Sequence, residues 1–393
     1  MRILYIVSEL DKCGASLSFL TLLRGMRERG IEAFVVSPDW NLVDDNFVAL
    51  LQKMSVPYKL LPITWDIKDE NPKSKTIKRK IKDLIKWFLR RGNNPKKNKE
   101  KAVTQLQEII NNFNPDIVHT NVGVIHIGYE ICKKMGIKHV WHIREYQDLD
   151  FHWVPLPSKD AFINQLKDTD AVITITKDLK KYFGLDNCNT ARTIYNGVFN
   201  QSESSLELPK SNYFLCASRL VQAKGHVDVV KAFGSFYKVN PHYQLIFAGI
   251  GDNWYIDQLK LLANELHCEE GISFIGHQKE IKPYMKKAKA LIVASYSEGF
   301  GRMTAEAAFC GCLVIGRNTA GTKEILDEIG GFRFEKSSEE LFEQMRIVSQ
   351  LTDEEYLRLA QYAQNRAKEL YSNENYVSQV YDVYKQLYEK EKE

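Results

Sequence analysis

Short apolar runs typical of buried β-strands alternate with helical stretches along this 393-residue chain, and the alternation occurs twice. The strand-like runs of the first half are RILYIVS (2–8), EAFVVSP (32–38), PDIVHTN (115–121), KHVWHIRE (138–145) and DAVITIT (170–176). Those of the second half are NYFLCASRL (212–220), YQLIFAGIG (243–251), ISFIG (272–276), AKALIVASY (288–296) and CLVIG (312–316). The pattern predicts two α/β units with parallel sheets, whose ligands lie beyond the carboxyl ends of the strands.

A polar stretch, NQSESSLELPKSN (200–212), separates the two patterns and has the composition of an interdomain linker. It predicts a Rossmann-like N-terminal domain over 1–199 and a second Rossmann-like domain over 200–370. The final residues, 371–393, read as a helix with apolar side chains at helical spacing: Tyr376, Val380, Val383, Tyr384 and Leu387. Two sheets facing each other would leave a cleft, which is the expected binding site.

The composition is ordinary for a globular protein and excludes several classes. A formal net charge of +4 gives no reason to expect nucleic acid as a partner. No apolar run approaches the roughly 20 residues that span a bilayer, and the opening MRILYIVSEL is too short for a signal peptide. Seven scattered cysteines, an odd number, predict a cytoplasmic protein when no export signal accompanies them.

The stretch SEGFGRMTAE (297–306) lies between a predicted strand and a predicted helix, MTAEAAFCG (303–311). Unpaired N–H groups at the start of a helix favour an anion. Gly299 and Gly301 have no Cβ, so that a phosphate can approach the backbone closely. Arg302 adds positive charge. The turn therefore has the features of a phosphate site.

Two carboxylates, Glu298 and Glu306, flank these glycines. A carboxylate accepts two hydrogen bonds side by side, which suits the hydroxyls of a sugar or a ribose. A nucleotide-sugar has a phosphate in its middle and hydroxyls at both ends, and it fits this arrangement. The alternative is a glycine-rich turn with solvated charges, and the stretch alone leaves both interpretations open.

Two cations occur in ASRLVQAKG (217–225): Arg219 at the end of a predicted strand and Lys224 at the start of the following helix. Two fixed cations can hold a diphosphate and stabilise the negative charge that builds on it as it leaves, which removes the need for a metal. The alternative is a pair of surface cations in a loop. The glutamates predicted nearby favour the diphosphate.

A further glycine pair, Gly249 and Gly251, follows a strand in FAGIGDNW (247–254). Trp254 occupies the position of the third glycine in the dinucleotide fingerprint, so that the signal for NAD is weak. The pair is expected either to line the nucleotide pocket or to form a tight strand-to-helix turn.

In the first half, His142 stands at the end of a predicted strand, with Arg144 and Glu145 in the loop that follows. At a strand end facing the cleft, His142 is a catalytic candidate, and the alternative is a structural histidine. The acidic stretch DLD (148–150) lacks further ligands nearby, so that no metal site is expected. YNGVFN (195–200) predicts a turn leading to the hinge.

The segment over 72–102 is strongly basic and interleaves apolar residues such as Ile81 and Phe88 with lysines and arginines. It predicts a basic amphipathic helix that lies on an anionic membrane surface. The alternative is a helix that packs its apolar side on its own domain. No base-reading motif accompanies the charge, so that nucleic acid is not expected as a partner.

Together these stretches resemble the retaining glycosyltransferases of family 4 (glycosyl transferases group 1), which have the GT-B fold of two Rossmann-like domains facing each other across a cleft. Glu298 and Glu306 match the ends of the family's E-x7-E signature. SRLVQAKG (218–225) is similar to its G-R-L-x-x-x-K-G, with Ser218 in place of the first glycine.

The resemblance extends over nearly the whole chain and is looser in the first half. IYNGVF (194–199) is similar to the family's N-G-V-D, with Phe199 where an acid is usual. Gly14 and Ala15 are similar to a glycine pair whose second member is lost, a change expected to alter acceptor or phosphate contacts there.

The resemblance implies retention of configuration, no metal and no other cofactor, and a last helix (371–393) that crosses back to the first domain. It implies that Arg219 and Lys224 bind the diphosphate, that Glu306 binds the ribose, and that Glu298 binds the donor sugar. The donor side comprises Arg219, Lys224, Glu298, Gly299, Phe300, Gly301 and Glu306, with Gly249 and Gly251 added from their position. The acceptor side comprises Gly14, Ala15, His142 and Arg144, and the catalytic candidates are Glu298, His142, Arg219 and Lys224.

The function predicted from the sequence is a hexosyltransferase that uses a nucleotide-diphosphate sugar, with a UDP-sugar as the first candidate. Its acceptor would be a glycan or a lipid-linked precursor of a surface polysaccharide or glycoconjugate, at the inner face of the membrane. Alternatives are a GT-B enzyme of another type, such as a nucleotide-sugar epimerase, and a non-catalytic nucleotide or membrane-surface binding module. An NAD oxidoreductase ranks below these because the fingerprint is incomplete.

Overall fold

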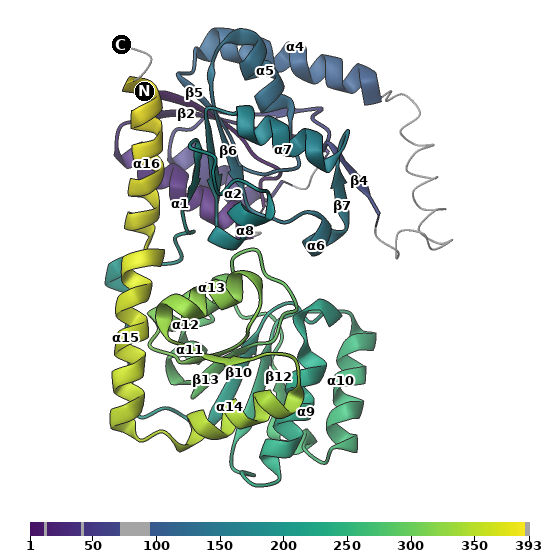
Figure 1. The fold of residues 1–393 in the computed structure, drawn as a ribbon, viewed down its shortest axis with the longest axis vertical. Coiled ribbons are helices and arrows are strands. Elements are labelled where there is room, and N and C mark those ends of the chain that lie inside the picture. Colours follow the sequence, from purple (N-terminus) through teal and green to yellow (C-terminus); the bar gives the residue numbers. More distant parts are fainter. Residues whose placement is uncertain (12–13, 41–42, 71–94, 390–393) are drawn as a thin grey trace. The chain divides into compact units, whose positions relative to one another are not determined.

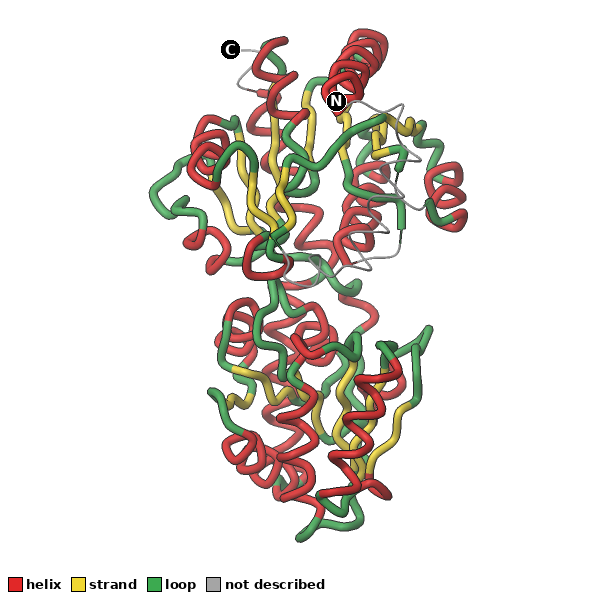
Figure 2. The backbone as a smooth tube through the Cα atoms, turned by 90° about the vertical axis from the view of Figure 1, so that its right-hand side faces the viewer, coloured by secondary structure: helices red, strands yellow, loops and turns green. Residues whose placement is uncertain are grey.

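The computed structural model describes residues 1–11, 14–40, 43–70 and 95–389 (Figures 1 and 2). The described chain divides into two compact units. The first unit consists of Met1–Tyr195 together with Tyr376–Glu393, and the second consists of Asn196–Asn375. Each unit is a sheet covered by helices.

Within the described residues, seven parallel strands form the sheet of the first unit, in the order β3-β2-β1-β5-β6-β8-β9. The strands are β1 (Arg2–Ile6), β2 (Glu32–Pro38), β3 (Tyr58–Leu61), β5 (Ile117–Thr120), β6 (Lys138–Ile143), β8 (Ala171–Thr174) and β9 (Ala191–Thr193). A separate antiparallel pair joins β4 (Ile67–Asp69) to β7 (Trp153–Pro155).

Helices cover both faces of this sheet because successive side chains of a strand point to opposite faces. Ile3 and Tyr5 of β1 belong to one core cluster, whereas Leu4 and Ile6 belong to another. The helices are α1 (Gly14–Glu28), α2 (Asp45–Lys53), α4 (Pro95–Phe113), α5 (Ile127–Met135), α6 (Asp148–Phe151), α7 (Lys159–Asp168) and α8 (Lys177–Tyr182).

The C-terminal helix α16 (Asn373–Glu389) completes the core of the first unit. The predicted apolar spacing is confirmed for Tyr376, Val380 and Tyr384, which are fully buried. Helix α1 accommodates α16 at Gly25, where a Cβ would lie 2.5 Å from Cγ1 of Val377. Glycine at this position therefore sets how closely the two helices pack.

Six parallel strands, counted over the described residues, form the sheet of the second unit in the order β12-β11-β10-β13-β14-β15. They are β10 (Tyr213–Ala217), β11 (Gln244–Ala248), β12 (Ile272–Phe274), β13 (Ala290–Val293), β14 (Val314–Arg317) and β15 (Phe332–Phe334). The helices are α9 (His226–Tyr237), α10 (Asn253–Glu265), α11 (Lys282–Lys287), α12 (Arg302–Phe309), α13 (Ala320–Ile329), α14 (Ser338–Gln350) and α15 (Asp353–Tyr371).

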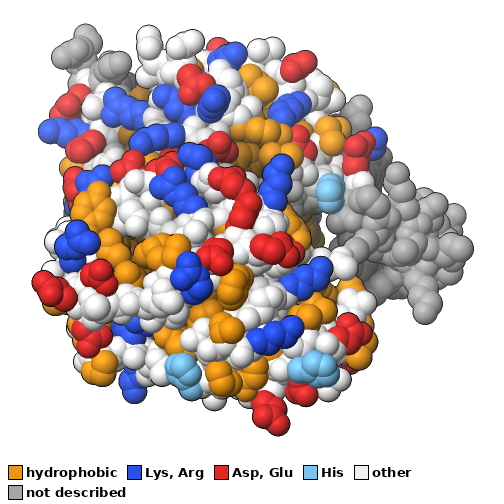
Figure 3. Space-filling view, turned by 60° about the horizontal axis from the view of Figure 1, so that its bottom comes forward, with side chains coloured by type: hydrophobic (Ala, Val, Ile, Leu, Met, Phe, Trp, Pro, Cys, Tyr) orange, Lys and Arg blue, Asp and Glu red, His pale blue; other side chains and the backbone are white. Residues whose placement is uncertain are grey.

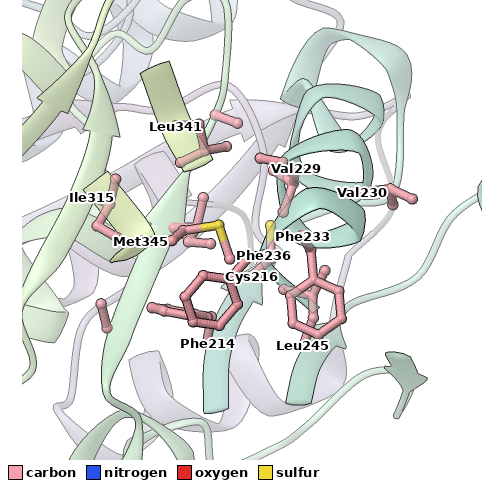
Figure 4. Packing of buried hydrophobic residues seen from close by; sticks show 14 of the residues in the cluster. Phe214, Cys216, Val229, Val230, Phe233, Phe236, Leu245, Ile315, Leu341 and Met345 are labelled. Atoms are coloured by element: carbon pink, nitrogen blue, oxygen red, sulfur yellow. The ribbon is translucent and has the colours of Figure 1, made fainter. Parts of the chain in front are cut away.

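One face of this second sheet packs against α9 and α14 (Figure 4). Phe214 of β10 lies between Phe233 of α9 and Met345 of α14, and all of these side chains are buried. The sheet order places β10 and β13 at the centre, so that the loops after these two strands meet at one edge. The predicted α/β fold with two Rossmann-like units is confirmed.

Most of the basic segment predicted over 72–102 lies outside the described residues. Its described end forms the start of α4, where Ala102 is buried in the first-unit core. None of the described helices is long and apolar enough to cross a membrane. Figure 3 shows acidic and basic side chains interspersed on the face in view, in keeping with the net charge of +4.

The contact between α1 and α16 gives a test of the first unit. Gly25→Ala should destabilise the protein by about 1–3 kcal/mol, because the added methyl group overpacks against Val377. Adding Val377→Ala removes the clash. The double variant should therefore lose less stability than the two single variants lose together, and the difference should be about 0.5–3 kcal/mol. Urea denaturation of the four proteins measures this coupling. Additive losses would contradict the packing described.

Candidate active site

The turn after β13 carries the residues of the predicted E-x7-E motif. Gly301 has φ +81°, a left-handed conformation that favours glycine, and it caps the start of α12. The turn is held by α13, where Gly321 N–H donates to the Glu298 carbonyl at 2.9 Å. A Cβ on Gly321 would lie 2.8 Å from the Phe300 carbonyl oxygen. The backbone of the turn is therefore fixed by close contact with the next helix.

Lys224 and Glu298 form an ion pair at the carboxyl edge of the second sheet. Their Nζ and Oε1 atoms are 2.6 Å apart, and about a fifth of each side chain is exposed (19% and 22%). Ser295 Oγ donates to the same carboxylate oxygen at 2.7 Å. The sequence predicts both residues on the donor, and the structure brings them together. Each charge neutralises the other, so that a bound phosphate would compete with Glu298 for Lys224.

Glu306 pairs with Arg302 inside α12. Arg302 Nε donates to Glu306 Oε1 at 2.6 Å, and the guanidinium also donates to the carbonyls of Gly197 and Val198 at 3.3 and 3.1 Å. Burial raises the pKa of Glu306, although the Arg302 charge opposes the shift. Arg302, which was expected to add positive charge to a phosphate site, directs its donors to Glu306 and to the 197–198 backbone.

Arg219 and Lys224 lie in the loop between β10 and α9, as predicted, although their exact places differ. Arg219 is exposed and stands two residues beyond the end of β10. Lys224 ends a short 3-10 helix, Gln222–Lys224, and α9 begins at His226. Gly225 separates them with φ +69°, and a Cβ there would lie 2.1 Å from the Ala294 carbonyl oxygen. The loop thus packs directly on the end of β13.

Close backbone packing requires glycine at both Gly249 and Gly251. A Cβ on Gly249 would lie 1.8 Å from the Ser218 carbonyl oxygen, and one on Gly251 would lie 2.0 Å from that of Leu220. Leu220 N–H also donates to the Ile250 carbonyl at 2.7 Å. Of the two interpretations of this pair, the tight turn accounts for both glycines, since their Cα atoms face the β10 loop.

In the first unit, His142 is fully buried near the end of β6, so that the expected exposed position is not found. Its Nδ1 lies 3.3 Å from Arg144 Nη2. Burial, together with the nearby Arg144 and His119, holds the pKa of His142 well below its ordinary value. Arg144 is itself nearly buried and donates to the Asn121 side chain and to Tyr376 OH at 2.9 Å each. His142 is therefore a neutral core histidine beside a fixed guanidinium.

Gly14 and Ala15 form the start of α1. Gly14 is exposed, and a Cβ there would meet no atom within 4 Å. The loop residues 12 and 13 that precede it lie outside the described residues. The predicted glycine-pair position is thus a helix start with open space beside it.

Sequence reasoning missed Glu145 as a site residue and did not single out Gln147. Gly123 N–H donates to Glu145 Oε1 at 2.8 Å, and burial raises the pKa of Glu145 to about 7. Gln147 is fully buried with φ +69°, and both atoms of its amide lack a hydrogen-bond partner among the described residues. A carboxylate directly after a strand was the one signal available for Glu145.

Two family models together match residues 13–366 of the chain. The model for Glycosyltransferase Family 4 matches residues 13–199, and the model for Glycosyl transferases group 1 matches residues 198–366. The chain belongs to this glycosyltransferase family. The predicted resemblance is thereby confirmed.

Two curated relatives of this family 4 chain are similar in sequence. An uncharacterized glycosyltransferase of Methanocaldococcus jannaschii is 25% identical over 239 residues, which cover 59% of this chain and 64% of the relative. The N-acetyl-alpha-D-glucosaminyl L-malate synthase of Bacillus anthracis is 21% identical over 241 residues, which cover 57% of this chain and 62% of the relative. The chain thus matches less than two thirds of the length of either relative.

Solved glycosyltransferase structures share the fold of this family 4 chain. Anabaena Alr3699/HepE in complex with UDP has a TM-score of 0.77 at 18% identity, covering 98% of this chain and 100% of that one. The lipopolysaccharide outer core galactosyltransferase WaaB has a TM-score of 0.70 at 15% identity, covering 98% and 99%. At this identity the likeness shows the fold alone. Across the described residues no cluster of three or more His, Cys, Asp or Glu is placed to hold a metal ion.

The buried Glu145 predicts a dependence of stability on pH. Its pKa is about 7 in the folded state against an ordinary 4.5, so that the folded state binds a proton more tightly than the unfolded chain does. The stability contributed by this group is therefore lost as the pH rises from 4.5 to about 7, by up to about 3 kcal/mol. Glu145→Gln should remove this loss.

Denaturant unfolding of wild type and Glu145→Gln across this pH range measures the effect. As the pH rises, the free energy of unfolding of wild type should fall relative to that of Glu145→Gln. A difference that stays constant between pH 4.5 and 7 would show that Glu145 titrates normally.

Proposed function

We propose that this chain is a retaining hexosyltransferase that takes a sugar from a UDP-sugar to a glycan or lipid-linked acceptor, in the synthesis of a surface polysaccharide or glycoconjugate. The observation that carries the proposal is the Lys224–Glu298 pair at the carboxyl edge of the second sheet, with Arg219 on the same loop as Lys224. Membership of the glycosyltransferase family supports the reaction class. HepE, which shares the fold, was crystallised with UDP and with UDP-glucose, and this supports the donor class.

In this proposal Lys224 and Arg219 bind the diphosphate. A phosphate carries more negative charge than Glu298, so that Lys224 can exchange its partner when the donor binds. Glu298, released from Lys224 and still held by Ser295 Oγ, then accepts hydrogen bonds from the hydroxyls of the donor sugar. The ion pair thus keeps both side chains in position for the ligand.

Glu306 is assigned to the ribose hydroxyls. Arg302 occupies one of its oxygens, Oε1, and leaves Oε2 for a ligand. Burial makes a charged hydrogen bond to this carboxylate stronger than it would be in water. The turn over Gly299, Phe300 and Gly301 is assigned to the sugar and phosphate, where its backbone approaches the donor.

The chemistry assigned to the chain is electrostatic. As the bond between the sugar and the diphosphate breaks, negative charge grows on the leaving phosphate, and Arg219 and Lys224 stabilise it without a metal ion. Retention by attack on the same face of the sugar needs no nucleophile from the protein, so that none is assigned. As the acceptor hydroxyl attacks, its proton would pass to an oxygen of the departing diphosphate, which gains negative charge in the same step.

The acceptor is assigned to the first unit. Gly14 offers open space at a helix start, which Ala15 continues, and Arg144 offers a fixed guanidinium after β6. His142, which is buried, would act through Arg144 and not by touching the acceptor. The basic segment over 72–102 is proposed to hold the protein at the cytoplasmic face of a membrane.

A thermal-shift panel tests the donor site. UDP should raise the melting temperature more than GDP, ADP or NAD does, with or without Mg²⁺. A ligand that binds only the native state adds about 2.7 kcal/mol of stability at a hundredfold excess over Kd. Arg219→Ala should abolish the shift. Arg346→Ala is the matched control, since Arg346 lies on α14 in the same unit and is comparably exposed.

Several outcomes would overturn the donor site. Stabilisation by NAD alone would do so, as would the failure of every nucleotide to stabilise the protein. An equal shift in wild type and Arg219→Ala would show that the nucleotide binds elsewhere.

The alternative of a non-catalytic binding module makes a different prediction for Glu306. Glu306→Ala should reduce transfer from UDP-glucose, UDP-galactose or UDP-N-acetylglucosamine by about 10²–10³-fold, because a buried charge that contacts the donor is lost. Release of UDP in the presence of glycan acceptors measures this rate. Under the alternative, wild type releases no UDP and the substitution changes nothing.

A further inference from the structure

Four aromatic rings form a row in the described part of the first unit: Trp40, Trp65, Trp153 and Phe151. Neighbouring ring centroids lie 5.2, 5.1 and 4.2 Å apart along the row. The first two contacts are edge-to-face, and the last is a stacked pair with 20° between the ring planes. These residues, the aromatic row, come from segments far apart in the sequence.

The row is rigid inside and exposed at its ends. Trp65 and Trp153 pack on the buried core of the first unit. Trp40 and Phe151 are 42% and 37% exposed. Trp40 Nε1 donates to the Ile63 carbonyl at 2.5 Å, which fixes the plane of its ring. Large aromatic side chains that are both exposed and held in place are typical of binding sites.

The row lies where ligands of parallel sheets gather. Trp40 stands two residues past the end of β2, Trp65 four residues past β3, and Phe151 follows the loop after β6. These are carboxyl ends of strands in one parallel sheet, which is the edge at which α/β sheets bind their ligands. Figure 1 shows α6, which ends at Phe151, next to β7 and β4.

A strained turn holds the exposed end of the row. Gln147 has φ +69° and ψ −71°, and Asp148 N–H donates to the Tyr146 carbonyl at 3.0 Å across it. This tight turn is rare and costs energy for a residue other than glycine. The Gln147 carbonyl accepts from the N–H groups of Phe151 and Trp153 at 2.9 and 3.2 Å. These two hydrogen bonds hold the backbone of the stacked pair, Phe151 and Trp153, against the turn.

Four carboxylates lie near the row among the described residues. Asp148 and Asp150 flank Leu149 on α6, and Asp69 and Glu70 lie at the end of β4. Two of these carboxylates are paired with lysines, Asp148 with Lys159 at 3.2 Å and Glu70 with Lys68 at 2.7 Å. Carboxylates disfavour an anionic membrane surface but accept hydrogen bonds from hydroxyls.

We propose that the aromatic row is an acceptor subsite for an uncharged oligosaccharide. Its sugar rings would lie with their C–H faces on Trp40 and Phe151, because these faces are apolar and the face of an aromatic ring is electron-rich. The carboxylates on α6 and β4 would accept hydrogen bonds from the sugar hydroxyls. The inference rests on the proposed function, since it places the acceptor of that reaction on the first unit.

The competing occupant is a lipid. Leu149 and Leu156 are 57% and 44% exposed near the row and would suit an acyl chain. The fixed ring planes and the carboxylates beside them favour the oligosaccharide, because both suit a rigid ring that carries hydroxyls. The experiment therefore measures the binding of oligosaccharides and the binding of lipid vesicles separately.

The experiment measures binding of maltotetraose, cellotetraose and chitotetraose to the full-length protein by intrinsic tryptophan fluorescence, at up to about 10 mM because millimolar binding is expected. At least one should bind to wild type. Trp40→Ala and Phe151→Ala should each weaken this binding by about tenfold, the loss expected of one aromatic stacking contact. Phe151→Tyr should keep it. Tyr362→Ala, at an exposed ring on α15, is the control and should change nothing.

Two results would overturn the proposal. One is that no oligosaccharide binds to wild type, or that the alanine variants bind as well as wild type does. The other is that vesicles of phosphatidylcholine and phosphatidylglycerol bind to wild type and lose binding in these variants, while the oligosaccharides do not bind.

A parallel UDP thermal shift separates this proposal from the donor site. UDP should stabilise wild type, Trp40→Ala and Phe151→Ala equally, because the row takes no part in donor binding. If UDP stabilises none of them while the oligosaccharide still binds, the transferase proposal fails and the sugar site stands. In a transfer assay with a sugar donor that the enzyme uses, Trp40→Ala and Phe151→Ala should raise the KM for the acceptor and leave the KM for the donor unchanged.

Discussion

Contact between backbones at the carboxyl edge of the second sheet is the constraint on which the candidate active site depends. The loops after β10, β11 and β13 meet there with no room for side chains between them. A Cβ on Gly225, Gly249 or Gly251 would lie about 2 Å from a carbonyl oxygen of a neighbouring loop. Only glycine allows this approach. The loop that carries Arg219 and Lys224 is thereby pressed against the end of β13, beside the turn that carries Glu298.

Paired charges follow from this packing. Lys224 meets Glu298 because their loops are in contact, and Arg302 meets Glu306 one turn along α12. Neither pair is fully exposed, and the attraction within each pair offsets part of the hydration that its charges lose. Such pairs keep polar side chains in position until a ligand with stronger charge replaces one partner. The arrangement suits a donor that carries phosphates and hydroxyls together.

The alternation of apolar runs was enough to predict two parallel sheets, and the strand-to-helix pattern around Gly299 and Gly301 was enough to predict the turn between β13 and α12. Short edge strands such as β9 and β15 carried too little periodicity to be found. The burial of His142 beneath α16 could not be predicted either, because it depends on Tyr376, more than two hundred residues away in the chain. The strained turn at Gln147 has no local sequence signature, since neighbouring segments impose it.

The most direct test of the central claim is calorimetric titration of wild type and Lys224→Ala with UDP and with uridine. If Lys224 leaves Glu298 to bind the diphosphate, the substitution should weaken UDP binding by at least about tenfold, the value of one charged hydrogen bond, and should leave uridine binding unchanged. Equal weakening of both ligands, or of neither, would contradict the account, because Lys224 would then serve only to hold Glu298.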